Sequence, residues 1–352
     1  MESFKDSALA ARIVFGTDTI RQLPDELARL AGKRALIIST PQQRDQAEQV
    51  QVLLGDSAAA IFSGAAMHTP VEVTAKAMRI VEDRQIDCLV AIGGGSTTGL
   101  SKAIAYRTDL PQIVIATTYA GSEMTPILGQ TEGGVKTTLR DQKVVPEVVI
   151  YDVRLTLTLP PDLSGTSGIN AIAHAVEALY AENKSPETSS MAVEGIEKLA
   201  RALPVIARNP QDLGARMDAL SGASLCGQCL AKVDMALHHK LCHTLGGSFD
   251  LPHAETHTAV LPHTTAYNAE ADPLAMQRIA RALGSEAAPM GLYELGHAVN
   301  AKMALRDLGL PESDLDRAAD LAVQKPYWNP RPLERDAIRE LLEGAWTGKP
   351  PL

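Results

Sequence analysis

The sequence has few cysteines and no hydrophobic run long enough to cross a membrane. Its four cysteines include Cys226 and Cys229, a C-x-x-C that has neither a second pair nor a preceding strand. We therefore expect reduced, structural thiols. No apolar run approaches the roughly 18 residues of a membrane helix. With 352 residues, of which 45% are hydrophobic, the chain is long enough for two packed domains.

The sequence also lacks an excess of positive charge, and its first residues do not have the pattern of a signal peptide. Its 33 Lys and Arg against 42 Asp and Glu give a net charge of −9. This balance argues against nucleic acid or an anionic membrane as a partner. Residues 1–13 have neither the basic start nor the apolar core of a signal peptide. We expect a cytoplasmic protein that acts on a small molecule.

Strand patterns are confined to the first half of the chain, where they alternate with helical patterns. This order predicts a parallel sheet with helices on both faces, as in dinucleotide-binding domains. After about Asp162 only helical patterns remain, which predicts an all-α second domain. We place the boundary at the prolines near Leu159, giving domains 1–157 and 158–352. The predicted strands are 34–39, 58–62, 87–92, 112–116 and 147–151, and predicted helices include 20–30, 71–81 and 98–106.

A glycine-rich loop, residues 93–97 (GGGST), lies between a predicted strand and a predicted helix. Backbone N–H groups at such a helix start can hold a pyrophosphate, so Gly94, Gly95 and Ser96 are candidate cofactor residues. The six-residue dinucleotide fingerprint is incomplete, because Thr98 stands where its last glycine belongs. A simple strand-to-helix turn is the alternative interpretation.

Two other loops follow predicted strands and could contact the same cofactor. Thr117, Thr118 and the nearby Ser122 offer hydroxyl groups, although a Ser/Thr turn explains them equally well. Ser39 and Gln42 follow the strand predicted at 34–39. This loop lacks the acidic residue that would bind a ribose 2′-hydroxyl and repel a 2′-phosphate, so both NADH and NADPH remain candidates.

Six of the nine histidines lie between His238 and His263. His239 and His243 are spaced to share one helix face, and so are Asn170 and His174 upstream. A helix break at 246–247 (GG) would let the chain bring His253 back toward them. Three imidazoles and an acid would bind a divalent cation, but Asn170 supplies an amide without charge. Histidines that only pack inside a helical core are the alternative.

Four ordered stretches resemble the iron-containing alcohol dehydrogenase family. The resemblance implies its fold, also called dehydroquinate synthase-like: an NAD(P)-binding α/β domain followed by an all-α domain. The stretches are 93–102 (GGGSTTGLSK), 117–126 (TTYAGSEMTP), 166–180 (TSGINAIAHAVEALY) and 238–258 (HHKLCHTLGGSFDLPHAETHT).

The resemblance also assigns residues. The family's four metal ligands, an Asp and three His, fall on Asn170, His174, His239 and His253, and its additional active-site histidine falls on His243. The chain departs from the family at Asn170, where the acid is missing, and at Gly99, which stands where the family commonly has Asp. The first departure weakens a metal site, because neutral ligands leave the charge of the cation uncompensated.

These features resemble most the branch of the family that reduces maleylacetate to 3-oxoadipate with NADH or NADPH, without a metal, in the breakdown of aromatic compounds. By this resemblance the protein is a homodimer, and its substrate is a small dicarboxylate. His243 and His239 are the expected catalytic residues, and Asn170, His174, His253 and Lys136 are expected around the substrate.

The sequence allows alternatives for the substrate-binding cations, for the metal and for the function. Arg140 and Lys240 compete with Lys136 as the cations that face the substrate carboxylates. A metal-dependent alcohol or aldehyde dehydrogenase would instead use His174, His239 and His253 as ligands. A non-catalytic nucleotide-binding protein on this fold is a further alternative.

Overall fold

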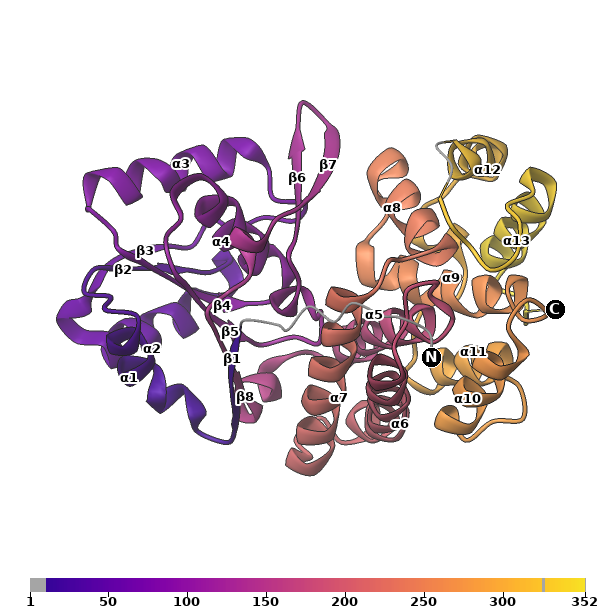
Figure 1. The fold of residues 1–352 in the computed structure, drawn as a ribbon, viewed down its shortest axis with the longest axis horizontal. Helices are drawn as coiled ribbons and strands as arrows, with labels where there is room; N and C mark the ends of the chain where they lie inside the picture. Colours follow the sequence, from indigo (N-terminus) through magenta and orange to yellow (C-terminus); the bar gives the residue numbers. More distant parts are fainter. Residues whose placement is uncertain (1–10, 325–326, 352) are drawn as a thin grey trace. The chain divides into compact units, whose positions relative to one another are not determined.

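The structure, a computed structural model, describes residues 11–324 and 327–351, without the side chains of Val135 and Lys136. The chain divides into two compact units that meet in sequence between Leu159 and Pro160. Each unit has its own layers of secondary structure (Figure 1).

A six-stranded parallel sheet organises the first unit. Short apolar strands of this kind are typical of a sheet that helices cover on both faces. The strand order is β1-β8-β5-β4-β2-β3, so the loops after β5, β4 and β2 start from adjacent strands. The strands are β1 (Arg12–Gly16), β2 (Ala35–Ile38), β3 (Ala58–Phe62), β4 (Cys88–Gly93), β5 (Gln112–Ala116) and β8 (Val148–Asp152).

Side chains alternate along each strand and feed two hydrophobic cores. Val90 and Ile92 of β4 pack with α1 (Leu23–Arg29) and α2 (Arg44–Leu54) on one face. Leu89 and Ala91 pack with α3 (Val71–Asp83) and α4 (Gly95–Thr108) on the other. The sheet with helices on both faces is therefore as predicted (Figure 1).

Several elements of this unit were not predicted. Strand β1 lies in a stretch for which the sequence patterns indicate no strand, whereas α2 fills a gap between two predicted strands, as the alternation of strands and helices implies. An antiparallel hairpin, β6 (Ile127–Glu132) and β7 (Val135–Arg140), interrupts the parallel pattern. Its turn residues Gly133 and Gly134 have φ of 55° and 78°, the left-handed pair that a two-residue hairpin turn requires.

Lys102 ties helix α4 to the segment before the hairpin. Its ammonium is 1% exposed and lies 2.6 Å from the carbonyl oxygens of Ser122 and Thr125 and 3.0 Å from that of Ile127. Burial lowers the pKa of Lys102 to about 7, and the nearby carboxyl of Glu123 opposes this shift. The buried cation thus fixes the loop that carries Ser122.

The second unit is helical, as predicted, apart from its loops and short 3-10 turns. Its helices are α5 (Pro161–Tyr180), α6 (Pro186–Arg208), α7 (Leu213–Lys232), α8 (Leu237–Phe249), α9 (His253–Tyr267), α10 (Pro273–Leu283), α11 (Ala288–Ala298), α12 (Leu315–Val323) and α13 (Arg335–Thr347).

One expectation about this unit was wrong. Helix α8 continues through Gly246 and Gly247 to Phe249, so these glycines do not break it. The C-cap residue of α8 is Asp250, which has a φ of 55°. Pro252 is the N-cap residue of α9. Gly246 is buried and Gly247 is exposed, and both are helical although glycine is a poor helix former.

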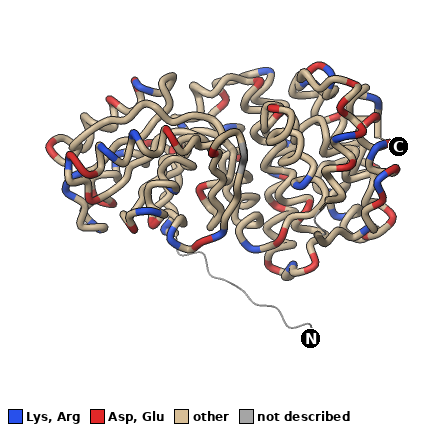
Figure 2. Tube along the Cα trace, turned by 90° about the horizontal axis from the view of Figure 1, so that it is seen from above, with Lys and Arg blue, Asp and Glu red and all other residues tan. Residues whose placement is uncertain are grey.

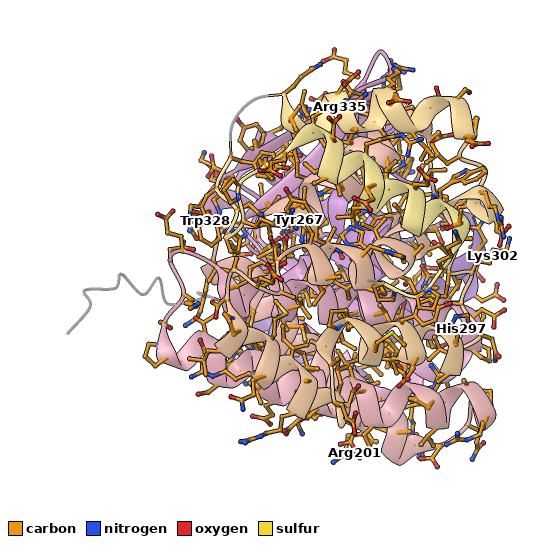
Figure 3. All side chains as sticks on the ribbon, turned by 90° about the vertical axis from the view of Figure 1, so that its right-hand side faces the viewer. Arg201, Tyr267, His297, Lys302, Trp328 and Arg335 are labelled. Atoms are coloured by element: carbon orange, nitrogen blue, oxygen red, sulfur yellow. The ribbon has the colours of Figure 1, made fainter. Side chains whose placement is uncertain are left out.

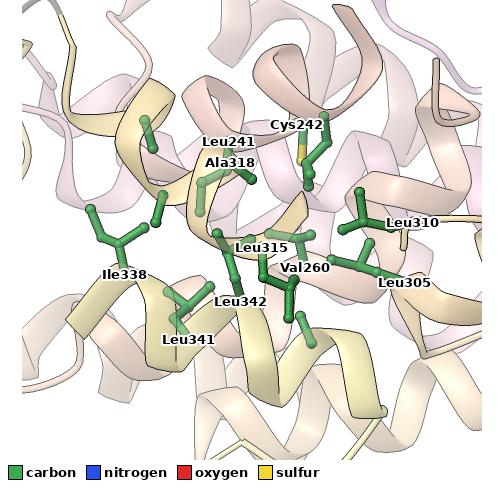
Figure 4. Close-up of a cluster of buried hydrophobic side chains, with 14 of the residues drawn as sticks. Leu241, Cys242, Val260, Leu305, Leu310, Leu315, Ala318, Ile338, Leu341 and Leu342 are labelled. Carbon is green, nitrogen blue, oxygen red and sulfur yellow. The ribbon is translucent and has the colours of Figure 1, made fainter. Parts of the chain in front are cut away.

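An apolar core lies behind α8 and α9. Leu241 and Cys242 of α8 pack with Val260 of α9 and with α12 and α13 (Figure 4). Tyr267 lies at the end of α9 (Figure 3). Its hydroxyl donates a 2.6 Å hydrogen bond to the carbonyl of Pro332, and the Arg331 guanidinium lies 4.2 Å from the centroid of its ring. These contacts hold α8 and α9 against α12, α13 and the segment around Pro332.

All four cysteines are buried without a disulfide, and burial raises the pKa of each thiol, in agreement with structural roles. Acidic and basic residues are interspersed along the described chain (Figure 2). None of its helices is long and apolar enough to span a bilayer.

Lys102→Met should destabilise the protein by about 3 kcal/mol, because three carbonyl oxygens lose a buried cationic donor. Lys76→Met is the matched control, since Lys76 is exposed on α3. The free energy of unfolding from urea denaturation measures both effects. Equal stability of the two variants would contradict a structural role for Lys102.

Candidate functional site

Three helices of the second unit bring the clustered histidines together. The ring centroids of His174 (α5) and His239 (α8) are 5.1 Å apart. His239 lies 6.2 Å from His243, and His243 lies 6.4 Å from His253 at the start of α9. Asn170, also on α5, is 3% exposed. The four histidines therefore form one cluster, and Asn170 lies one helical turn before His174 on α5; we call these five residues the histidine cluster.

Glu177, one helical turn after His174, orients His239. Its Oε2 lies 2.6 Å from Nδ1 of His239 and accepts a 3.0 Å hydrogen bond from the backbone N–H of Ala236. Its Oε1 accepts another, at 2.8 Å, from the N–H of His238. The Glu177 carboxylate thus binds the ring of His239 and also accepts hydrogen bonds from two backbone N–H groups at the start of α8, which have no partner within the helix.

A second network starts at His238, whose ring centroid lies 5.4 Å from that of His239. The ring of His238 contacts Thr264 and His257 of α9. Nδ1 of His238 is 3.1 Å from Oγ1 of Thr264, and Nε2 is 2.9 Å from Nδ1 of His257. Sγ of Cys242 is 3.7 Å from the same Nε2.

Three polar atoms of the histidine cluster and one atom of the adjacent His257 are buried without a hydrogen-bond partner among the described residues. They come from all three helices: Oδ1 of Asn170, Nδ1 of His174, Nε2 of His239 and Nε2 of His257. Unpaired buried polar atoms are costly and uncommon in folded proteins. Their concentration at one place indicates a site that a ligand completes.

Burial also keeps the inner histidines uncharged. It lowers the pKa of His174, His238 and His257 well below the usual value, and the neighbouring imidazoles lower it further. His263 is separate from the cluster, since it packs against Gly344 of α13. Burial alone lowers the pKa of His263 to about 4.

One group in this region has the composition of a metal site. The potential ligand atoms of His238, Cys242 and His257 all lie within 4.8 Å of one another, and the three residues are buried. This group differs from the set that the family resemblance assigns to a metal, although His238 is adjacent to His239 in the sequence. The hydrogen bonds among its members account for their closeness.

The candidate cofactor residues lie in the first unit, at the ends of adjacent strands. Gly94 is the N-cap of α4, and Gly95 and Ser96 form its first turn after β4. Thr117 and Thr118 follow β5, and the Thr117 N–H donates to the carbonyl of Gly93 at 3.0 Å. Residues from both loops thus meet at one edge of the sheet.

Ser39 and Gln42 follow β2 and differ in exposure. Ser39 is fully buried, and its hydroxyl donates to Ser63 Oγ at 2.9 Å, whereas Gln42 is exposed. The neighbouring Gln43, which sequence analysis missed, donates a 2.8 Å hydrogen bond to Thr117 Oγ1. Ser122 has a buried hydroxyl without a partner among the described residues.

Contacts within the loops explain why two of the three glycines are needed. A Cβ atom on Gly93 would lie 2.6 Å from Gln43 Oε1, and one on Gly94 would lie 2.7 Å from Thr118 Cγ2. At Gly95 the nearest atom is 3.9 Å away. Space for an approaching anion is therefore found at Gly95, where α4 begins.

Gly99 is constrained by an unusual residue. A Cβ atom at this position would lie 2.4 Å from Oγ1 of Thr69. Thr69 is 4% exposed and has a φ of 46°, a conformation that β-branched residues rarely adopt. An aspartate at position 99 would require Thr69 to move, so the two residues depend on each other.

The three cations considered for the substrate have different surroundings. Lys136 belongs to β7, and its side chain lies outside the described residues. Arg140 ends the same strand. Nζ of Lys240 on α8 lies 5.7 Å from the ring centroid of Tyr327. None of the described contacts assigns one of them to a carboxylate ligand.

Sequence reasoning missed Glu177 and Thr264. A signal for Glu177 was present, because Asn170, His174 and Glu177 follow the i, i+4, i+7 spacing of one helix face. Thr264 gave no comparable signal, since its role depends on how α8 and α9 pack together.

Comparisons with known proteins agree with this architecture. The sequence profile described as iron-containing alcohol dehydrogenase matches residues 10–153. The profile described as the C-terminal part of the Fe-containing alcohol dehydrogenase family matches residues 164–346. Together they cover most of both units.

Individual relatives match along the whole chain. A protein of Rhizobium sp. (strain MTP-10005) named maleylacetate reductase is 55% identical over 351 residues, 100% of both chains. The crystal structure of a maleylacetate reductase from Agrobacterium tumefaciens has 55% identity, full coverage of both chains and a TM-score of 0.96.

A crystal structure of an iron-containing alcohol dehydrogenase from Corynebacterium glutamicum has 41% identity and a TM-score of 0.93, and the match covers 98% of this chain and 97% of that one. Family profiles, full-length relatives and the two-unit architecture lead to one conclusion. The chain belongs to the iron-containing alcohol dehydrogenase family.

Proposed function

We propose that the protein is an oxidoreductase that reduces the carbon–carbon double bond of maleylacetate to give 3-oxoadipate, with NADH or NADPH as hydride donor. The observation that carries this proposal is the 55% identity, over the whole chain, to a relative named maleylacetate reductase. This match spans α5, α8 and α9, the helices that carry the histidine cluster.

The reaction needs one hydride and one proton. The double bond of maleylacetate is conjugated to a ketone. Hydride addition to the carbon β to the ketone moves an electron pair onto the ketone oxygen, which becomes an enolate. The enolate must be stabilised by hydrogen-bond donors and then protonated at carbon.

The histidine cluster supplies groups suited to the second part of this reaction. We assign the proton transfer to His243 or His239, because an imidazole is a common general acid in enzymes. Glu177 fixes the ring of His239, so that proton exchange with substrate occurs through Nε2. Asn170 and His174 orient the substrate, and His253 borders the same space.

The first unit is assigned the cofactor. In this proposal, the N–H groups at the start of α4, with Gly94, Gly95 and Ser96, hold the pyrophosphate. Thr117, Thr118 and Ser122 contact the rest of the dinucleotide, and Ser39 and Gln42 border its ribose. Because Ser39 and Gln42 are neutral, this proposal includes both NADH and NADPH.

The metal requirement is the point where sequence and family disagree. The family description names iron, and the unpartnered donor atoms of Asn170, His174 and His239 fit a divalent ion in kind. With His253 they would hold the ion, which would polarise the ketone oxygen. These ligands carry no negative charge, however, and the Glu177 carboxylate is already bonded to His239. We propose that turnover does not require a metal.

The wider setting is part of the same proposal. The activity belongs to the breakdown of aromatic compounds, the protein acts in the cytoplasm, and it is a homodimer. Oligomers of soluble enzymes are most often symmetric dimers. Neither nucleic acid nor a membrane is a partner in this proposal.

The purified protein should oxidise NADH or NADPH in the presence of maleylacetate, and treatment with a strong chelator should leave the rate unchanged. The absorbance of the reduced cofactor follows the reaction, and elemental analysis of the same sample measures bound metal. Loss of turnover with chelator and recovery with Fe²⁺ or Zn²⁺ would overturn the metal-free proposal. Absence of turnover under all these conditions would overturn the substrate assignment.

His243→Ala should lower kcat about 10²-fold, the usual contribution of a general acid. The matched control is His297→Ala, because His297 is exposed on α11 (Figure 3). Steady-state kinetics with maleylacetate compare the two variants. If His243→Ala turns over as fast as the control, His243 is not the proton donor.

Glu177→Gln should lower kcat about 10- to 100-fold, the range found for groups that orient active-site imidazoles. The amide keeps the size of the side chain and loses the charge that faces His239. Glu182→Gln, on the exposed segment after α5, serves as the control. Unchanged kcat in a folded Glu177→Gln variant would show that orientation of His239 is unimportant.

A further inference from the structure

The network of Thr264, His238 and His257 is not used by the proposed mechanism, although it adjoins the histidine cluster. The ring of His257 lies 4.4 Å from that of His253 and 5.0 Å from that of His239, measured between centroids. His238 and His257 are both fully buried. The outer atom of the network, Nε2 of His257, has no hydrogen-bond partner among the described residues.

Hydrogen-bond counting gives the network a direction. The Thr264 hydroxyl lies 3.2 Å from the carbonyl oxygen of Val260 and 3.1 Å from that of Leu261, and donates to them. Its oxygen then accepts the proton on Nδ1 of His238. A neutral His238 protonated at Nδ1 has a lone pair on Nε2, which accepts the proton on Nδ1 of His257.

The reverse direction makes one hydrogen bond fewer. If Thr264 donated to His238, its oxygen would face two carbonyl oxygens at 3.1 and 3.2 Å with no proton between them. In addition, His257 would be left with a buried N–H that has no acceptor, and orphaned donors are rarer than orphaned acceptors.

We propose that His238 is a positioning residue that holds His257 in the tautomer protonated at Nδ1, so that Nε2 of His257 is a fixed hydrogen-bond acceptor at the histidine cluster. Such an acceptor orients an N–H or O–H donor beside His253 and His239. Its effect on turnover rests on the proposed function, whereas the tautomer itself does not.

The tautomer can be observed directly. In protein labelled with ¹⁵N-histidine, the nitrogen shifts of His257, assigned with a His257→Gln variant, distinguish a proton on Nδ1 from one on Nε2. We expect Nδ1 to be protonated in the wild-type protein. A proton on Nε2 would overturn the proposal, whatever the substrate of the enzyme.

Substitutions of His238 test whether it fixes this tautomer. His238→Leu removes the acceptor, so the His257 signals should become those of mixed tautomers. His238→Gln keeps a carbonyl oxygen for His257 and an amide donor for Thr264, and should restore the single tautomer. A single Nδ1-protonated form in the leucine variant would overturn the proposal.

Kinetics give the second measurement. His238→Leu should lower kcat for maleylacetate about 10- to 100-fold, and His238→Gln should recover most of it. KM for the nicotinamide cofactor should stay unchanged, because the candidate cofactor residues lie in the other unit. A parallel rise in that KM would indicate general structural damage instead. If neither the wild-type protein nor any variant turns over maleylacetate, the proposed function is wrong. The tautomer measurement still tests whether His238 positions His257.

Thr264→Val and Thr265→Val form a matched pair. Both hydroxyls are buried and donate to helix carbonyls, but only Thr264 also contacts a histidine. The first variant should change the His257 signals and lower kcat, and the second should do neither. Equal effects of the two variants would contradict the proposed hydrogen-bond network of Thr264, His238 and His257.

Cys242→Ala separates this proposal from a metal site. It should leave the His257 tautomer and kcat close to wild type, because the thiol makes only one weak contact with His238. If the purified protein contains stoichiometric Zn²⁺ that this variant loses, the ion occupies the space between His238 and His257. That result would overturn the proposal.

Discussion

The buried carboxylate of Glu177 is the contact on which the site depends. Burial of a charge is costly unless hydrogen bonds replace its water. Here they do, because one carboxylate binds His239 and the N–H groups of Ala236 and His238. The same side chain therefore stabilises the start of α8 and orients an imidazole. Loss of Glu177 would disturb the helix and the histidine together.

From this contact the cluster divides into two networks. His239 belongs to the side held by Glu177, whereas His238, the next residue, belongs to the side held by Thr264. Adjacent residues on a helix point in different directions, so one dipeptide serves both networks. The atoms left without partners, such as Nε2 of His239 and Nε2 of His257, lie at the cluster where the two networks meet.

Patterns of sequence were reliable where local spacing decides the structure. The strands from β2 to β5 and the face shared by His239 and His243 were predicted in this way. The pattern failed where tertiary contacts override local preference. Helix α8 continues through Gly246 and Gly247, and a hairpin replaces part of the expected βα alternation. Glycine lowers helix stability, but packing can compensate.

The sequence by itself determined the class of the fold and the residue types of the site. Periodicity separated a parallel-sheet unit from a helical one, and Asn170 in place of an acid made the ligand set neutral. Only the tertiary structure decided which polar atoms of the site have hydrogen-bond partners and which can bind a ligand. Hydrogen-bond direction depends on distances between helices that are far apart in the chain. Thr264 and His238, for example, are 26 positions apart in the sequence, but Oγ1 of Thr264 and Nδ1 of His238 are only 3.1 Å apart.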